Sequence, residues 1–285
     1  MCYYIWFLKD LCTFMLLAKV IILIMRNIIE NIGNYTNFWE CDFTGNIIEG
    51  DILRNPRRTA SSCVTDSCKW PKVNGVVKVP YVFENGYKNV QKNLIKNYLS
   101  IFKDQTCVEF VPRTDETDYI AFTNQMGCAS YVGRQGGKQV VFLKHENNGV
   151  TCVDSYVVQH EALHVIGFLH EQNRIDRDDH VTIHWDNIQS ELQPNFKIYS
   201  SVNLGIPYDY NSILHYSRTT FSENGQPTIT ANDDYDRVLG GSVLSADDIR
   251  RVKALYECCK CWRDKYYLTC DNTCNVKICR YILNS

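Results

Sequence analysis

The sequence has 285 residues, and its 45% hydrophobic content is enough for a buried core in one large domain or two small ones. Its 30 Lys and Arg residues stand against 32 Asp and Glu residues, so a net charge of −2 gives no reason to expect nucleic acid or an anionic membrane surface as a partner. Fourteen cysteines, spread along the chain, favour disulfides and an extracellular location over the reducing cytosol.

The first 25 residues predict a signal peptide and therefore secretion. Residues 11–25 are apolar apart from Thr13 and Lys19, which is the length of a signal-peptide core and short of the roughly 20 residues that span a bilayer. The signal is irregular, because charged residues precede the apolar run and no clear cleavage site follows it. An uncleaved anchor and initiation at Met15 are the alternatives, and we expect no stable membrane insertion.

Residues 26–58 are mostly polar and predict a removable pro-segment. They contain a glycosylation sequon at Asn34 and end in a basic stretch that includes Arg57 and Arg58. An ordinary flexible arm has the same composition, so composition alone leaves both interpretations open.

Residues 59–258 predict one domain with two lobes, since no repeat or low-complexity linker interrupts them. The first half mixes predicted strands and helices. Strand-like runs occupy 76–83, 107–111, 118–123 and 139–143, and helical patterns occupy 88–102 and about 156–169. In the first helical pattern, the residues at helical spacing are Val90, Leu94, Ile95, Tyr98 and Phe102.

The second half is rich in Asp, Asn, Ser and Tyr after His170 and has few long apolar runs. Near its end, Ser245 can cap a helix that has Asp248 at its third position.

A histidine-rich motif at the end of the second helical pattern predicts a metal site. On a helix, His160 and His164 face the same way and can present two imidazole nitrogens to one ion. Gly167 can take the left-handed conformation that ends a helix, which lets His170 approach the same ion. Three protein ligands leave a position open for water, and Glu161 can accept the water's proton and pass it to a leaving amine.

The segment HEALHVIGFLHEQNRIDRDDHV resembles the zinc-binding signature of the astacin family of metalloendopeptidases, in the metzincin group. The segment PYDYNSILHY, residues 207–216, is similar to the second family site, and the resemblance covers about residues 41–258. It implies an α+β, two-lobed metzincin-type protease domain, with a twisted mixed sheet and helices in the N-terminal lobe and a mostly irregular C-terminal lobe. It also implies one zinc ion per catalytic domain and protein or peptide substrates.

The same resemblance implies roles for three residues outside the histidine motif. Tyr216 would help to bind zinc in the resting enzyme and stabilise the oxyanion during reaction. Leu214 replaces the usual methionine of the turn beneath the metal, a change of similar volume that typically costs less than about 1.5 kcal/mol. Asp51, in a motif similar to the family's FxGD, would occupy the water's place on zinc, so that the pro-segment inhibits its own enzyme.

The resemblance also implies the disulfides Cys107–Cys258 and Cys128–Cys152. An additional pair, Cys63–Cys68, is similar to the start of the hatching-enzyme branch of the family, which suggests egg-envelope or other extracellular substrates. In other members a buried mature N-terminus pairs with the glutamate after the third histidine, here Glu171. The extension that carries the Cys63–Cys68 pair argues against that pairing.

Residues 259–285 form a tail of unknown role, either a small disulfide-stapled module or a disordered or spurious segment. Its cysteines are Cys259, Cys261, Cys270, Cys274 and Cys279. The remaining histidines, which we expect to be surface or structural residues and not further ligands, are His145, His180, His184 and His215. A catalytically silent binding protein that retains the protease fold is the alternative function.

Overall fold

The computed structural model describes residues 47–55, 67–125, 127–146, 151–199 and 203–258, together with the backbone of 261–263 and 268–270. These residues all belong to one compact unit, Cys41–Ser285. The predicted signal peptide, the Asn34 sequon and Cys63 lie outside the described residues, and so do the tail cysteines apart from the backbone of Cys261 and Cys270. Within the described ranges, no helix combines the length and the apolar character needed to cross a membrane.

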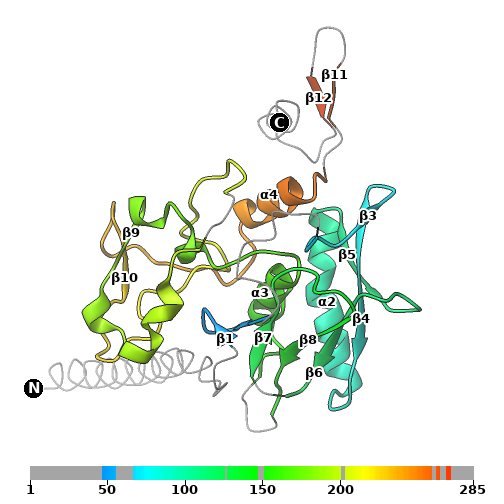
Figure 1. The fold of residues 1–285 in the computed structure, drawn as a ribbon, viewed down its shortest axis with the longest axis horizontal. Helices are drawn as coiled ribbons and strands as arrows, with labels where there is room; N and C mark the ends of the chain where they lie inside the picture. The colour runs from blue at the N-terminus through cyan, green and yellow to red at the C-terminus, as the bar shows by residue number, and fades with distance from the viewer. Residues whose placement is uncertain are drawn as a thin grey trace, which may run out of the picture. The chain divides into compact units, whose positions relative to one another are not determined.

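An eight-stranded mixed sheet forms the first half of this unit (Figure 1). Along one path the strand order is β1-β2-β7-β8-β6-β4-β3, and β5 also pairs with β4. The bounds are β1 Ile47–Ile48, β2 Ile52–Leu53, β3 Lys72–Val73, β4 Val76–Phe83, β5 Val108–Pro112, β6 Tyr119–Thr123, β7 Cys128–Ser130 and β8 Lys138–Leu143. The sequence predicts β4, β5, β6 and β8 within two residues, because these strands are long enough to show a β-branched or aromatic pattern.

The helix α2, Asn89–Gln105, packs against β5 and against α3, Ser155–Val165. The predicted apolar face of α2 is wrong in part. Val90 is 69% exposed and Leu94 is 37% exposed, whereas Gln91, Leu99 and the predicted Ile95 and Phe102 are buried. Polar Gln91 takes a buried position because its side-chain oxygen accepts a hydrogen bond from the backbone N–H of Lys88 at the start of the helix.

The second half has little regular structure, as the resemblance implies. Its strands β9, Val181–Ile183, and β10, Ile229–Ala231, pair antiparallel. Its short 3-10 helices are η2 Glu171–Asn173, η3 Arg177–Asp179, η4 Trp185–Asn187 and η5 Ser190–Phe196. A buried cluster that includes Phe196, Tyr208, Tyr216 and Ile229 forms its core.

The helix α4, Ala246–Leu255, has Ser245 as its N-cap, as the sequence predicts. The Ser245 hydroxyl accepts from the N–H of Asp248, and the Asp248 carboxylate accepts from the N–H of Ser245. The backbone hairpin β11–β12, Cys261–Arg263 and Leu268–Cys270, follows α4.

Two disulfides join Cys107 to Cys258 and Cys128 to Cys152, the pairs that the resemblance implies. The first links the start of β5 to the residues that follow α4, over a sequence separation of 151. Cys68 is also disulfide-bonded, and its predicted partner Cys63 lies outside the described residues.

Candidate metal centre

The helix α3 carries the first two histidines of the motif into the interior of the domain. Asp154 caps its N-terminus by accepting from the N–H of Val157. The helix ends at Val165, earlier than the predicted 169, because Gly167 adopts φ +115° and turns the chain. This turn brings His170 beside His160 and His164, as predicted.

Four side chains from two distant segments meet at this place. The imidazoles of His160, His164 and His170 and the carboxylate of Asp51 offer ligand atoms that all lie within 4.8 Å of one another, and all four residues are buried. The distances from Asp51 oxygens to histidine Nε2 atoms are 2.9 Å for His160, 3.4 Å for His170 and 3.6 Å for His164. Nε2 of His160 lies 3.1 Å from that of His164 and 3.3 Å from that of His170.

These separations, from 2.9 to 3.6 Å, lie within or slightly below the range expected for ligands that share one zinc ion. Ligands about 2.0–2.2 Å from zinc lie about 3.3–3.6 Å apart at tetrahedral angles. Each histidine also donates from Nδ1, to the carbonyls of Ile213 at 2.8 Å and Phe168 at 2.7 Å and to the Glu49 carboxylate at 2.9 Å. In a neutral imidazole that donates from Nδ1, Nε2 carries the lone pair, so all three rings can direct a lone pair at the same point.

The charges around this point also favour a cation. Burial opposes a charge on the imidazoles and lowers the pKa of His164 to about 4. At His170 the same burial effect is outweighed by the carboxylates of Asp51 and Glu49, which raise its pKa to about 10. The two buried carboxylates therefore stabilise positive charge at the centre of the group, and a divalent metal ion would supply it.

Asp51 reaches the histidines because it stands in a tight turn between β1 and β2. Glu49 and Gly50 in this turn have φ of +51° and +80°, in the left-handed region. A Cβ atom on Gly50 would lie 2.9 Å from Cζ of Phe221, so both conformation and space favour glycine there. This preference explains the Gly-Asp pair that the sequence analysis singled out.

Glu49 is a site residue that the sequence analysis missed. Its side chain is buried, and its Oε2 accepts from Nδ1 of His170 at 2.9 Å and from the backbone N–H of His170 at 3.3 Å. Its backbone carbonyl accepts from the Tyr216 hydroxyl at 2.6 Å. The only available signal was its position next to Gly50 and Asp51, since nothing in the sequence pairs residue 49 with residue 170.

Glu161 lies one residue after the first histidine and is 1% exposed. Neither of its carboxylate oxygens makes a hydrogen bond within the described part of the chain. Burial raises the pKa of the Glu161 carboxyl well above its usual range, and the negative charge of Asp51 raises it further. A carboxylate with this environment is suited to accept and return a proton.

The segment 207–216 contacts the histidines of the metal group. The Tyr216 ring centroid lies 4.9 Å from that of His170, and Leu214 is buried and lines the same small cavity as His170. The N–H of Glu171 donates to the Leu214 carbonyl, and the Ile213 carbonyl holds His160, so this segment is fixed to both ligand-bearing regions.

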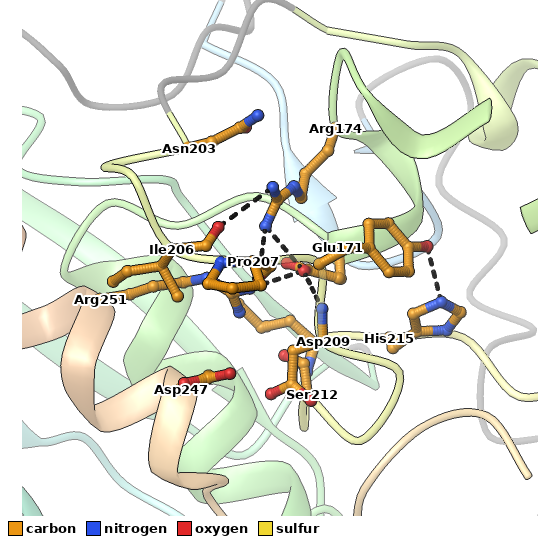
Figure 2. Close-up of polar contacts among 12 residues, drawn as sticks. Glu171, Arg174, Asn203, Ile206, Pro207, Asp209, Ser212, His215, Asp247 and Arg251 are labelled. Atoms are coloured by element: carbon orange, nitrogen blue, oxygen red, sulfur yellow. Dashed lines mark hydrogen bonds and ion pairs between the residues drawn. The ribbon is translucent and has the colours of Figure 1, made fainter. Parts of the chain in front are cut away.

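Glu171 sits in a buried ionic network (Figure 2). Its Oε1 accepts from Arg174 at 2.9 Å, from Arg251 at 2.6 Å and from the backbone N–H of Asp209 at 2.7 Å. Burial raises the pKa of Glu171, and the two guanidinium groups oppose that shift. The described residues therefore provide two guanidinium groups and a backbone N–H as partners for this buried carboxylate.

The remaining histidines contact hydroxyl and aromatic groups and lie outside the metal group. His145 lies 3.0 Å from the Thr151 hydroxyl and His184 lies 2.9 Å from the Thr230 hydroxyl. His180 stacks on Tyr208, whose hydroxyl lies 2.7 Å from Nε2 of His215.

Comparison with known proteins agrees with this geometry. The family model described as astacin, a peptidase family, matches residues 64–257. The chain belongs to the astacin family. It is therefore a zinc-dependent metalloendopeptidase by family, and the buried Asp and His group is able to bind the metal ion.

Several astacin-family relatives cover most of this domain. The low choriolytic enzyme of Oryzias latipes is 43% identical over 216 residues, which are 74% of this chain and 78% of that protein. Meprin A subunit beta of Homo sapiens is 38% identical over 74% of this chain and 30% of its own length. The solved structure of high choriolytic enzyme 1 of Oryzias latipes, a hatching enzyme, is 38% identical with a TM-score of 0.66, covering 70% of this chain and all of that one. The astacin fold is thus shared along with the motif.

Proposed function

We propose that this chain is a secreted zinc endopeptidase that is made as an inactive precursor and acts on extracellular proteins. Residues 1–25 serve as the signal peptide, 26–58 as the inhibitory pro-segment and 59–258 as the catalytic domain. The tail from 259 to 285 has no assigned role. Secretion is supported by the apolar N-terminal run and by the disulfides at Cys107 and Cys128, since such bonds persist in oxidising compartments.

The position of Asp51 is the observation that supports latency. In this proposal His160, His164 and His170 hold zinc, and the Asp51 carboxylate takes the place that water needs. In the same turn, the Glu49 carboxylate accepts a hydrogen bond from His170, and the Glu49 backbone carbonyl accepts one from the Tyr216 hydroxyl. Removal of the pro-segment would free both the metal position and the tyrosine.

Zinc held by His160, His164 and His170 would supply a Lewis acid that makes a bound water molecule more acidic and polarises a substrate carbonyl. Glu161 accepts the proton of the attacking water and returns it to the leaving amine. Tyr216 donates a hydrogen bond to the carbonyl oxygen as that oxygen gains negative charge.

The edge of the sheet offers a binding site for the substrate backbone. In the precursor, β2 pairs with β7 at Ile52 and Ser130, and the N–H of Ser130 donates to the Asp51 carbonyl at 3.0 Å. With the pro-segment removed, β7 becomes an edge strand, and an extended substrate can pair with it through main-chain hydrogen bonds.

Egg-envelope proteins are the proposed substrate class. The support is the likeness to choriolytic enzymes and the Cys63 and Cys68 pair that resembles the hatching-enzyme branch. The rates at which the processed chain hydrolyses isolated egg-envelope protein and denatured casein would be compared. They would distinguish an enzyme specific for egg-envelope proteins from one of broad specificity.

The decisive experiment measures casein hydrolysis by the chain cut in the region of Arg57 to Thr59, with and without a zinc chelator, beside Glu161→Ala. We expect both the chelator and the substitution to abolish activity. Inactivity of folded, zinc-loaded, processed protein would contradict the proposal and favour a binding protein that retains the protease fold.

A further inference from the structure

The helix α4 reaches the metal site through two side chains three residues apart. Asp248 and Arg251 are 2% and 8% exposed, and Nη1 of Arg251 lies 3.5 Å from Oδ1 of Asp248. Residues three apart on a helix lie on one face, so both side chains point to the same side of α4. Each contacts a different segment that supports a metal ligand.

Arg251 holds the segment that follows the third ligand. Its Nη2 donates to Oε1 of Glu171 at 2.6 Å and to the Pro207 carbonyl at 2.9 Å. Glu171 directly follows His170, and its N–H donates to the carbonyl of Leu214 at 3.1 Å. A shift of Glu171 would therefore move both the His170 backbone and the segment 207–216 at Leu214.

Asp248 binds the backbone segment that contacts His160, the first histidine of the motif. Its Oδ1 accepts from the Ser212 hydroxyl at 2.6 Å, and its Oδ2 accepts from the Ile213 N–H at 3.0 Å. The carbonyl of Ile213 in turn accepts from Nδ1 of His160. The same helix thus fixes the orientation of an imidazole that lies far earlier in the chain.

Of Asp248 and Arg251, it is Arg251 that compensates the buried negative charge of Glu171. Glu171 is buried, and a buried carboxylate that loses a partner is strongly destabilised. Arg174 also contacts Glu171, but its Nε and Nη2 donate to Asp176 at 2.9 and 2.8 Å. In the described part of the chain, Arg251 makes the shortest contact to Glu171.

We propose that Arg251 is a positioning residue for the metal site: by neutralising Glu171 and binding the Pro207 carbonyl, it fixes His170 relative to the segment 207–216. Changes to groups that orient metal ligands typically reduce metal affinity or activity about 10- to 100-fold. The inference rests on zinc binding by the three histidines, and it does not depend on which proteins the enzyme cleaves.

The test compares Arg251→Gln and Arg251→Lys with Arg250→Gln in the processed enzyme. Arg250 is the matched control, because it is the adjacent arginine of α4, is 39% exposed and pairs with Asp247. Zinc affinity is measured by competition with a chelator in the absence of substrate, and kcat and KM are measured on a peptide. We expect Arg251→Gln to lower zinc affinity or kcat about 10- to 100-fold with KM little changed. Arg251→Lys should lose less zinc affinity or kcat than Arg251→Gln. The zinc affinity and kcat of Arg250→Gln should stay within about twofold of the wild type.

A purely structural role would give a different result. Folded Arg251→Gln and Arg251→Lys enzymes that unfold at lower temperature but keep wild-type zinc affinity and kcat would overturn the proposal. If Arg251→Gln does not fold, Arg251→Lys alone decides, since it keeps the charge but has different donor geometry. A wild-type processed enzyme that binds no zinc would instead refute the metal assignment on which the inference rests.

Discussion

Oε2 of Glu49 lies 2.9 Å from Nδ1 of His170, so the turn between β1 and β2 binds the outer nitrogen of the third histidine of the motif. Asp51, two residues later, faces the Nε2 atoms of all three histidines. The turn between β1 and β2 therefore contacts both sides of the His170 ring. We expect the two carboxylates to make separate contributions to latency.

Replacing Asp51 with alanine should activate the precursor. The carboxylate is fully buried among the imidazoles, and its removal opens the fourth position to water. We expect the uncut Asp51→Ala precursor to hydrolyse casein in the presence of zinc, with activity that a chelator removes. A precursor as silent as the wild type would mean that another residue maintains latency.

Replacing Glu49 with glutamine should weaken latency by a smaller factor. Glutamine keeps an oxygen that can accept from His170 but loses the charge, which lowers the contribution of the hydrogen bond by about 1–1.5 kcal/mol and corresponds to about a 5- to 10-fold rise in background activity of the precursor. Cleavage after Arg57 or Arg58 removes residue 49, so the processed variant and wild type have identical sequences. Equal activity after processing shows that the variant folded, and an unchanged background beside an active Asp51→Ala precursor would exclude a role for Glu49.

Replacing Tyr216 with phenylalanine should lower kcat of the processed enzyme with little change in KM. The hydroxyl donates to the Glu49 carbonyl in this structure, and in the proposed mechanism it becomes available when the pro-segment is removed. Loss of one oxyanion donor typically costs about 10²–10³ in kcat. Steady-state kinetics on a peptide measures this effect, and a wild-type kcat would remove Tyr216 from the reaction.

Replacing Leu214 with methionine should change little. Leu214 is 4% exposed, and its backbone N–H and carbonyl are held by Ser212 and Glu171, so the turn does not depend on the side chain. A swap of similar volume typically costs less than about 1.5 kcal/mol. Thermal unfolding and casein hydrolysis should both stay close to wild type. A hundredfold rise in activity would show that leucine impairs the metal site.

The sequence by itself brought together the three histidines of the candidate metal centre as a local pattern. The spacing of His160 and His164 is sufficient because one helical turn brings them to the same face, and Gly167 marks the turn that returns His170. The main strands and the cap of α4 were also readable, because hydrophobic alternation and capping chemistry act over a few residues.

The tertiary structure decided the contacts between segments distant in sequence. Glu49 and His170 are 121 positions apart, and Arg251 and Glu171 are 80 positions apart. No local pattern links such pairs, because their distance depends on how β1–β2, α4 and the segment 207–216 pack around the histidines. The buried face of α2 was misassigned for the same reason: periodicity identifies an amphipathic helix, but the packing of β5 and α3 against it decides which side chains are buried.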